Sequence, residues 1–499
     1  MYGGIMDPLV LVIAAALIVL VVGSVVATMR YRYTRPNTAS VRMIAILTVV
    51  LAVLTVGVYA LPRVTASPGS NSPLGFGGSP TVAHSPIAGR SPTPTRTPSG
   101  STVIKIGSDL PVSGGDASVG LPIQNAIHLA IDEANANHSI PGYTLMFAPR
   151  DDVGPSGVHD PAVGSQNVTA LIGDALVAGI VGPFNSSVSK AEMPITNQAP
   201  IALISPSNTT PCLTKNTPLS GCTGVNDLLA SLRPTGTINY FRIAVTDDNQ
   251  AIAAANYLFT TLSYRKAYVI DDAESYGIGL ANNFIQEWQT NGGSLAGHDS
   301  LPSTTTNFST ELAKVAAAKP DVIYFGGIDA TGGTAIRQQM LQVQGLQNTP
   351  FVGGDGIYTS TFATTIGANN GGPVYSTTAF LDVTKLPQDF ISRYQNAYGQ
   401  QPGTYSAYGY DCANILIQAI KTALANGANT PADSADAAGA PVFRQAVIQA
   451  LKQISYNGVT GHQSFDANGD TTAKNILVYQ LANVNGQPSW KFITTVAVK

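Results

Sequence analysis

The strongest constraint on the fold is an alternation of short apolar runs and helical patterns that starts at residue 103. The run "VIKIG" (103–107) is followed by residues 121–136, whose apolar side chains recur at helical spacing. The same order continues and restarts near residue 240, with the apolar runs "VAGIVG" (177–182), "IALI" (201–204), "YFRIAV" (240–245), "KAYVID" (266–271) and "DVIYFGG" (321–327). Alternation of this kind predicts an α/β protein with parallel sheets flanked by helices.

The number of predicted strands indicates two lobes. A single open sheet of about ten strands tends to split or curl. Two doubly wound α/β lobes of about 120–200 residues each are the more economical arrangement. Ligands of such sheets bind beyond the carboxyl ends of the strands, so we expect the functional residues at those ends.

Two uncharged apolar segments precede this region, at 8–29 and 43–61. Each is long enough to cross a bilayer as a helix, which takes about 20 residues. The stretch between them, 30–42, carries four arginines and no acid. The positive-inside rule places that stretch in the cytoplasm. Residues 1–63 are therefore predicted to be a transmembrane hairpin, with the rest of the chain outside the cytoplasm.

A second interpretation of this N-terminus stays open. If translation starts at Met29, the second segment resembles a cleavable signal peptide, and "VYA" (58–60) suits a signal peptidase. Both interpretations predict an extracytoplasmic domain, 102–499. Residues 64–101 carry seven prolines among Ser, Thr and Gly, and we predict a disordered linker there.

Charge and cysteine content agree with this location. The net charge of −3 offers no surface for a polyanion, so nucleic acid is not an expected partner. Cys212 and Cys222 lie in the loop-like stretch "PCLTKNTPLSGCTG", and an oxidising compartment would allow them to form a disulfide. Cys412 lies in an apolar helical pattern and is expected to be a buried free thiol.

Several catalytic and metal-binding signatures are absent from the sequence. "GTYSAYG" has the wrong spacing for a nucleophile elbow, no P-loop occurs, and the six histidines show no metal-ligand pairing. "DANGD" (466–470) begins like a calcium loop, but Thr471 and Leu477 replace the required Gly and Glu, so a hairpin turn is predicted. We therefore expect no enzyme, no cofactor and no metal site.

Polar clusters instead follow the predicted strands. They are "GPFNSSVS" (182–189), "SPSNTTP" (205–211), "DDAESYG" (271–277) and "GGDG" (353–356). Together they supply hydroxyls, backbone amides, a phenol and a carboxylate. Small hydroxyls and helix N-terminal amides bind a carboxylate, and an acid binds an ammonium group. The clusters therefore suit a zwitterionic ligand.

These clusters occur in the order typical of a known family. Residues from about 103 to 495 resemble the leucine/isoleucine/valine-binding protein family, the type I solute-binding proteins of ABC importers. The resemblance runs through "IKIGSDLPVSGGDASVG", "GPFNSSVS", "ISPSNTTP", "DDAESYGIGLA", "NFSTELAKV", "PDVIYFGG", "GGDG" and "GHQSFDANGD". It rests on this order, since no single motif is specific.

The resemblance implies two α/β lobes joined by three crossovers, which close on the ligand. The implied crossovers lie near 244–247, 377–381 and 461–465. The implied lobes are lobe 1, about 102–244 and 380–462, and lobe 2, about 247–377 and 466–499.

The resemblance also implies six ligand-binding residues: Ser186, Ser207, Asn208, Thr209, Tyr276 and Asp355. Ser186 and the 207–209 cluster would bind the ligand carboxylate, and Tyr276 would stack on the ligand. Asp355 would bind the ammonium group, at a position where better-known members have Glu. Val119 occupies a position where an aromatic residue often closes the pocket, which leaves the side-chain preference open.

The sequence thus predicts a membrane-tethered solute-binding protein that captures an amino acid, branched-chain or similar. Its partners would be an ABC permease with cytoplasmic ATPase subunits. Two alternatives remain: a ligand-sensing ectodomain, and a binding protein for amides, urea or aromatic acids.

Overall fold

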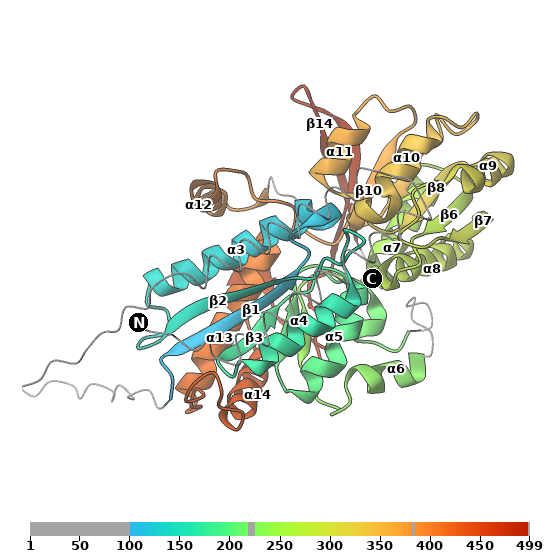
Figure 1. Ribbon diagram of the computed structural model, residues 1–499. Helices are drawn as coiled ribbons and strands as arrows, with labels where there is room; N and C mark the ends of the chain where they lie inside the picture. Colours follow the sequence, from blue (N-terminus) through green and yellow to red (C-terminus); the bar gives the residue numbers. More distant parts are fainter. Residues whose placement is uncertain (1–99, 218–224, 382–384, 498–499) are drawn as a thin grey trace, which may run out of the picture. The chain divides into compact units, whose positions relative to one another are not determined.

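The computed structural model describes residues 100–217, 225–381 and 385–497. Both predicted apolar segments, nearly all of the predicted linker and Cys222 lie outside these residues. Within them, no helix is both long and apolar enough to span a membrane. The described residues belong to one compact unit that contains two main sheets (Figure 1).

The first sheet has the strand order β2-β1-β3-β4-β5, and every neighbouring pair is parallel. Its strands are β1 (Val103–Leu110), β2 (Thr144–Asp151), β3 (Val177–Val181), β4 (Ala202–Ser205) and β5 (Tyr240–Arg242). The helices associated with it are α3 (Ala117–Ala136), α4 (Pro161–Gly173), α5 (Ser186–Gln198), α6 (Val225–Leu232), α13 (Ser406–Ala425) and α14 (Gly439–Leu451).

Strand alternation explains how the helices cover both faces of this sheet. In β3, Ala178 and Val181 pack into the cluster formed with α3, α13 and α14. Val177 and Ile180 pack with residues of α4 and α5 on the other face, because an irregularity of the β1–β3 register between Val177 and Gly179 shifts the alternation by one residue. Because successive side chains of a strand point to opposite faces, an all-apolar strand such as β3 has to be buried on both sides.

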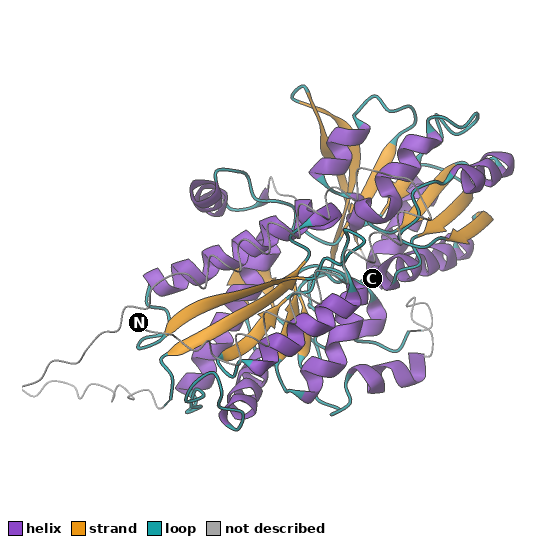
Figure 2. Ribbon diagram, in the orientation of Figure 1, coloured by secondary structure: helices purple, strands orange, loops and turns teal. Residues whose placement is uncertain are grey.

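The second sheet has the order β14-β13-β10-β9-β8-β6-β7. Five of its strands are parallel: β6 (Lys266–Asp271), β7 (Ser294–Ser300), β8 (Val322–Gly326), β9 (Phe351–Gly353) and β10 (Val374–Thr378). The other two form an antiparallel hairpin, β13 (Asn475–Val484) and β14 (Gln487–Ala497), and β13 pairs antiparallel to β10. The helices of this region are α7 (Asp247–Asn256), α8 (Ser275–Thr290), α9 (Ser309–Ala318), α10 (Thr334–Met340) and α11 (Ser360–Ile366) (Figure 2).

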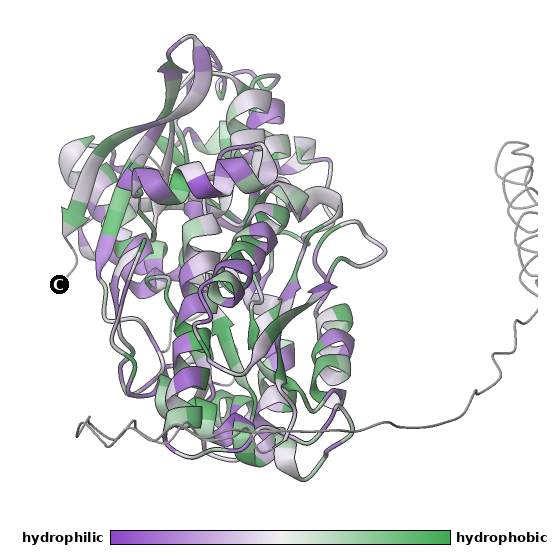
Figure 3. Ribbon diagram, turned by 90° about the vertical axis from the view of Figure 1, so that its left-hand side faces the viewer, coloured by the Kyte–Doolittle hydropathy of each residue, from purple (hydrophilic) through white to green (hydrophobic). Residues whose placement is uncertain are grey.

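The hydropathy of the elements follows their position. Hydrophobic residues are concentrated along the strands of the first sheet, while several helices show both colours (Figure 3). This pattern is typical of helices that cover a sheet with one face and contact water with the other. The predicted α/β class is confirmed.

The chain passes between the two sheet regions three times. It leaves the first sheet after β5 and returns after β10 to α12 (Gln388–Tyr398), α13 and α14. It leaves again after the small hairpin of β11 (Tyr456–Gly458) and β12 (Gly461–Gln463) and enters β13. The predicted turn at 466–470 is present, since Asp466 N donates to the Asp470 carbonyl at 2.8 Å.

One predicted strand is shorter in the structure. The apolar run 240–245 predicts six strand residues, but β5 ends at Arg242. Ile243, Ala244 and Val245 are buried in the first connection between the sheets instead. Apolar character in this stretch therefore reflects burial in a connection as well as sheet pairing.

Candidate ligand site

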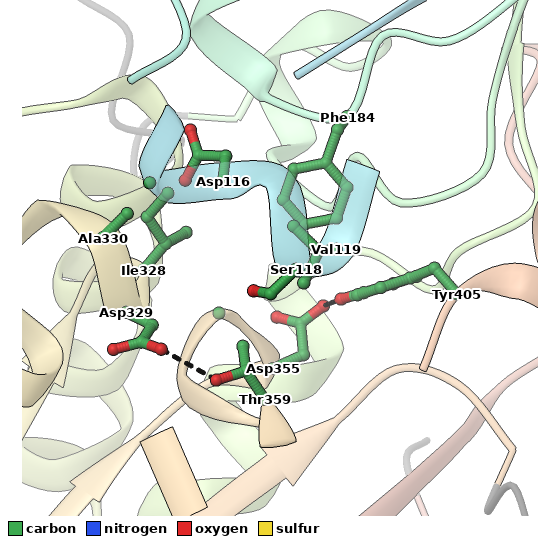
Figure 4. Close-up of a pocket in the computed structure, with 12 residues that line it drawn as sticks. Asp116, Ser118, Val119, Phe184, Ile328, Asp329, Ala330, Asp355, Thr359 and Tyr405 are labelled. Atoms are coloured by element: carbon green, nitrogen blue, oxygen red, sulfur yellow. Dashed lines mark hydrogen bonds between the residues drawn. The ribbon is translucent and has the colours of Figure 1, made fainter. Parts of the chain in front are cut away.

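A crevice lies where strand ends of both sheets meet. It consists of two adjoining cavities of about 280 Å³ and 310 Å³, volumes that include open solvent at the mouth of the crevice. Both cavities are lined by Phe184, Ile328, Asp355, Gly356 and Tyr405. The first adds Asn185, Ser186, Ser207 and Tyr276, and the second adds Gly115, Asp116, Ser118, Val119, Asp329, Ala330 and Thr359 (Figure 4).

Asp355 is held in the crevice by a set of neutral hydrogen-bond donors. It begins the short helix η5 (Asp355–Ile357) after β9, and only 3% of its surface is exposed. Its carboxylate accepts hydrogen bonds from the Tyr276 hydroxyl at 2.7 Å, from Gln250 Nε2 at 2.9 Å and from the Tyr405 hydroxyl. The Asp355 backbone N–H donates to Gln250 Oε1 at 3.1 Å. These contacts fix both the backbone and the carboxylate.

Among the described residues that line the crevice, none gives Asp355 a cationic partner. Burial raises the pKa of this carboxyl, and the hydrogen bonds from Tyr405, Tyr276 and Gln250 oppose that effect. No lysine or arginine is among the described residues that line the two cavities. Because a buried carboxylate is costly without a counter-charge, the site is complementary to a cation.

A second carboxyl lies behind Asp355. Asp247 is fully buried at the start of α7, and Gln250 Nε2 donates to its Oδ1 at 3.0 Å as well as to Asp355. Burial, and next the charge of Asp355, raise the pKa of Asp247 well above its usual range. The Gln250 side chain therefore contacts two carboxyl groups, and ionisation of one disfavours ionisation of the other.

The opposite wall of the crevice is the N-terminus of α5. Ser186 is the first residue of α5 and is buried, and Asn185 precedes it without a capping hydrogen bond. Ser207, which follows β4, donates from Oγ to the Phe184 carbonyl at 2.9 Å. Free N–H groups and the positive end of the helix dipole make such a terminus suitable for a carboxylate.

Two of the predicted residues do not line the crevice. The Asn208 side chain donates to the Phe184 carbonyl at 2.6 Å and accepts from the Tyr240 hydroxyl at 2.8 Å, so it fixes the loop after β4. The Thr209 carbonyl accepts from Asp247 N at 2.8 Å, and its buried hydroxyl makes no well-formed hydrogen bond with any described residue. The structure thus brings Ser186, Ser207, Tyr276 and Asp355 together, with 208–209 supporting them.

Sequence reasoning missed several residues of the crevice. Tyr405 lies in "GTYSAYG", which the sequence presents only as an imperfect nucleophile motif. Gln250 and Asp247 are three residues apart at the start of a helix, a spacing that places them on one face. Cys412 is buried and free, as predicted; Cys212 is disulfide-bonded, and its predicted partner lies outside the described residues.

Comparisons with known proteins place these observations in a family. Residues 103–487 match the sequence profile of a family described as periplasmic binding protein. A relative from Brucella suis, "Leu/Ile/Val-binding protein homolog 1", is 28% identical over 380 residues, which cover 76% of this chain and 90% of the relative.

Solved structures of similar fold cover nearly the same region. The branched-chain amino acid substrate-binding protein LivJ of Streptococcus pneumoniae, in complex with isoleucine, is 23% identical with a TM-score of 0.59, covering 79% of this chain and 99% of that chain. A solute-binding protein of R. palustris, in complex with 4-hydroxybenzoate, is 18% identical with a TM-score of 0.63, covering 79% and 97%. The predicted family resemblance is confirmed.

Proposed function

Because the chain belongs to the periplasmic binding protein family, we propose that it captures an α-amino acid in the crevice and delivers it to an ABC importer. The importer would consist of a permease and cytoplasmic ATPase subunits. The Leu/Ile/Val-binding relatives make branched-chain amino acids, or others of similar size, the first ligands to test.

One observation carries the ligand assignment. The Asp355 carboxylate, whose described partners are neutral, shares one cavity with Ser186 at the N-terminus of α5. An α-amino acid has an ammonium group that can bind the Asp355 carboxylate and a carboxylate that can bind the N-terminus of α5. Each charge of the ligand is then compensated in a site that is largely removed from water.

Aromatic acids are the second candidate. Phe184, Tyr276 and Tyr405 place three aromatic rings around the crevice, and the R. palustris neighbour was solved with 4-hydroxybenzoate. A monocarboxylate of this type has no cation for Asp355, however. It would bury the carboxylate of Asp355 beside the ligand without a counter-charge, so we rank amino acids first. Neutral amides and urea lack the cation as well.

The location of the protein is a further part of the proposal. The uncharged segments 8–29 and 43–61 would anchor it in the membrane, and the proline-rich linker would hold the binding domain outside the cytoplasm. A role as a sensor ectodomain would use the same crevice. It would differ in its partner, because a sensor signals to a receptor and an importer component needs a permease.

A thermal-shift panel tests the ligand class. The purified full-length chain would be heated with α-amino acids, their deaminated analogues, amides, urea, benzoates and sugars. A ligand at a hundred times its dissociation constant adds about 2.7 kcal/mol of stability, which raises the melting midpoint by a few degrees. We expect this response with α-amino acids. A response confined to sugars, benzoates or amides would overturn the assignment.

A further inference from the structure

The far end of the crevice is lined by carboxylates from both sheet regions. Asp116 ends the short helix η1 (Gly114–Asp116) after β1, and Asp329 begins η4 (Asp329–Gly333) after β8. Both line the same cavity as Asp355 (Figure 4). Three carboxylates therefore surround one cavity, and the described residues that line it include no lysine or arginine.

Asp116 and Asp329 differ in how the protein compensates their negative charges. Asp116 pairs with His159, whose Nδ1 lies 2.9 Å from Asp116 Oδ2. Asp329 instead accepts from two hydroxyls, those of Thr334 and, at 2.8 Å, Thr359. Burial raises the pKa of Asp329, and the charge of Asp116 adds to that effect. Asp329 is therefore the acid at this end that most lacks a positive partner.

The walls between the acids are apolar. Val119 and Ala330 line this cavity, and Phe184 and Ile328 line both parts of the crevice. Such walls accommodate methylene groups. A side chain with an aliphatic stem and a charged end satisfies both features, because long cationic side chains bury their stems and keep the charged group in polar surroundings.

A buried acceptor in the adjoining cavity, which contains Ser186 and Tyr276, indicates a ligand with hydrogen-bond donors. Asn185 is 6% exposed and lines the crevice, and its Oδ1 makes no hydrogen bond with any described residue. A buried acceptor of this kind costs free energy until a donor reaches it. The crevice thus has more acceptors than the described protein groups supply with donors.

We propose that the ligand is an α-amino acid with a cationic side chain, of the lysine, ornithine or arginine class. This inference rests on the proposed function. The α-ammonium group would bind Asp355, the stem would lie along Val119 and Ile328, and the cationic end would lie between Asp116 and Asp329. Because these two acids come from different sheet regions, the ligand would draw together two walls that otherwise repel each other.

The experiment compares L-lysine with L-norleucine, which has the same carbon chain without the terminal ammonium group. Calorimetry on the full-length chain should give a dissociation constant for lysine at least about tenfold lower than for norleucine. Asp329→Asn removes the charge with little change of shape, and should bring the ratio of the two constants close to one. Asp132→Asn, at an exposed acid of α3 outside the crevice, is the matched control and should leave the ratio as in the wild type.

The outcomes separate this inference from the proposed function. If norleucine or leucine binds and lysine, ornithine and arginine bind no tighter, the cationic class is wrong while amino acid binding stands. If glutamine or citrulline binds tighter than lysine, the side chain is a neutral donor and the inference is also wrong. If no α-amino acid binds, the proposed function itself fails.

Discussion

Asp355 shows how the residues of the crevice depend on the ligand. Its three donors, Tyr276, Tyr405 and Gln250, orient the carboxylate but carry no charge. Burial alone would favour the protonated form. A ligand ammonium group would reverse that preference, since an opposite charge at short distance stabilises the carboxylate. The site is therefore pre-oriented yet electrostatically incomplete.

The sequence predicted part of this site, and the limit has a physical reason. Ser186 and Asp355 lie in polar clusters shortly after β3 and β9, so the rule of strand ends predicts their side of the sheets, and the family resemblance supplies their roles. Tyr405 precedes a helix 50 residues further along the chain, and its hydroxyl reaches Asp355 only through tertiary folding. Asn208 could contact a ligand by its residue type, but its side-chain amide donates to the Phe184 carbonyl.

At the scale of elements, short strands with an apolar centre were the easiest to predict. β3 and β6 have the predicted bounds to within a residue, because an apolar run of this length between turn residues has few alternatives. The hairpin of β13 and β14 was not predicted. This hairpin pairs antiparallel at the edge of a largely parallel sheet. An alternation of strands and helices predicts only the parallel strands.

A cluster of acids is also buried at the first sheet, and none of its members forms an ion pair with a described residue. Asp109 lies in β1, Asp152 follows β2 and Glu192 lies in α5, and all three are inaccessible to solvent. Burial raises the pKa of Asp109 to about 6. Burial and the charge of Asp109 raise the pKa values of Asp152 and Glu192 well above their usual range. Burial also raises the pKa of Asp272, to about 7.

This cluster predicts a pH dependence of stability. A carboxyl whose folded pKa is raised contributes stability that is complete below its unfolded pKa, near 4, and is lost as the pH rises through the folded pKa. The melting midpoint of the ligand-free protein should therefore fall between pH 5 and pH 8. Glu192→Gln, which is neutral and similar in shape, should reduce that fall, and Asp132→Asn should not. A midpoint that rises with pH over this interval would contradict the account.

At the scale of the whole molecule, the binding domain accounts for only part of the chain. The charge pattern of the first 63 residues predicts a membrane anchor, and residues 64–101 predict a spacer. The family profile starts at residue 103, after both. The chain therefore combines a domain common to the family with an N-terminal region whose predicted anchor remains to be tested.

Fractionation of cells tests the predicted anchor. The full-length protein should sediment with membranes and stay there after a high-salt wash, because burial of two apolar segments does not depend on ionic strength. A variant with four consecutive charged residues inserted into 43–61 measures the contribution of that segment and should be released. Quantitative recovery of the unaltered protein from the medium would instead support a cleaved signal peptide.

The most direct test of the central claim is calorimetry on the wild type and on Asp355→Asn. Each would be titrated with the α-amino acid that gives the largest thermal shift and with its analogue lacking the amino group. Truncation of one partner of a buried charge pair costs about 2–5 kcal/mol, so the variant should bind the amino acid about 30-fold more weakly or worse. The analogue should bind weakly to the wild type and no more weakly to the variant. Equal losses for both ligands would show that Asp355 supports the loop and does not recognise the ammonium group.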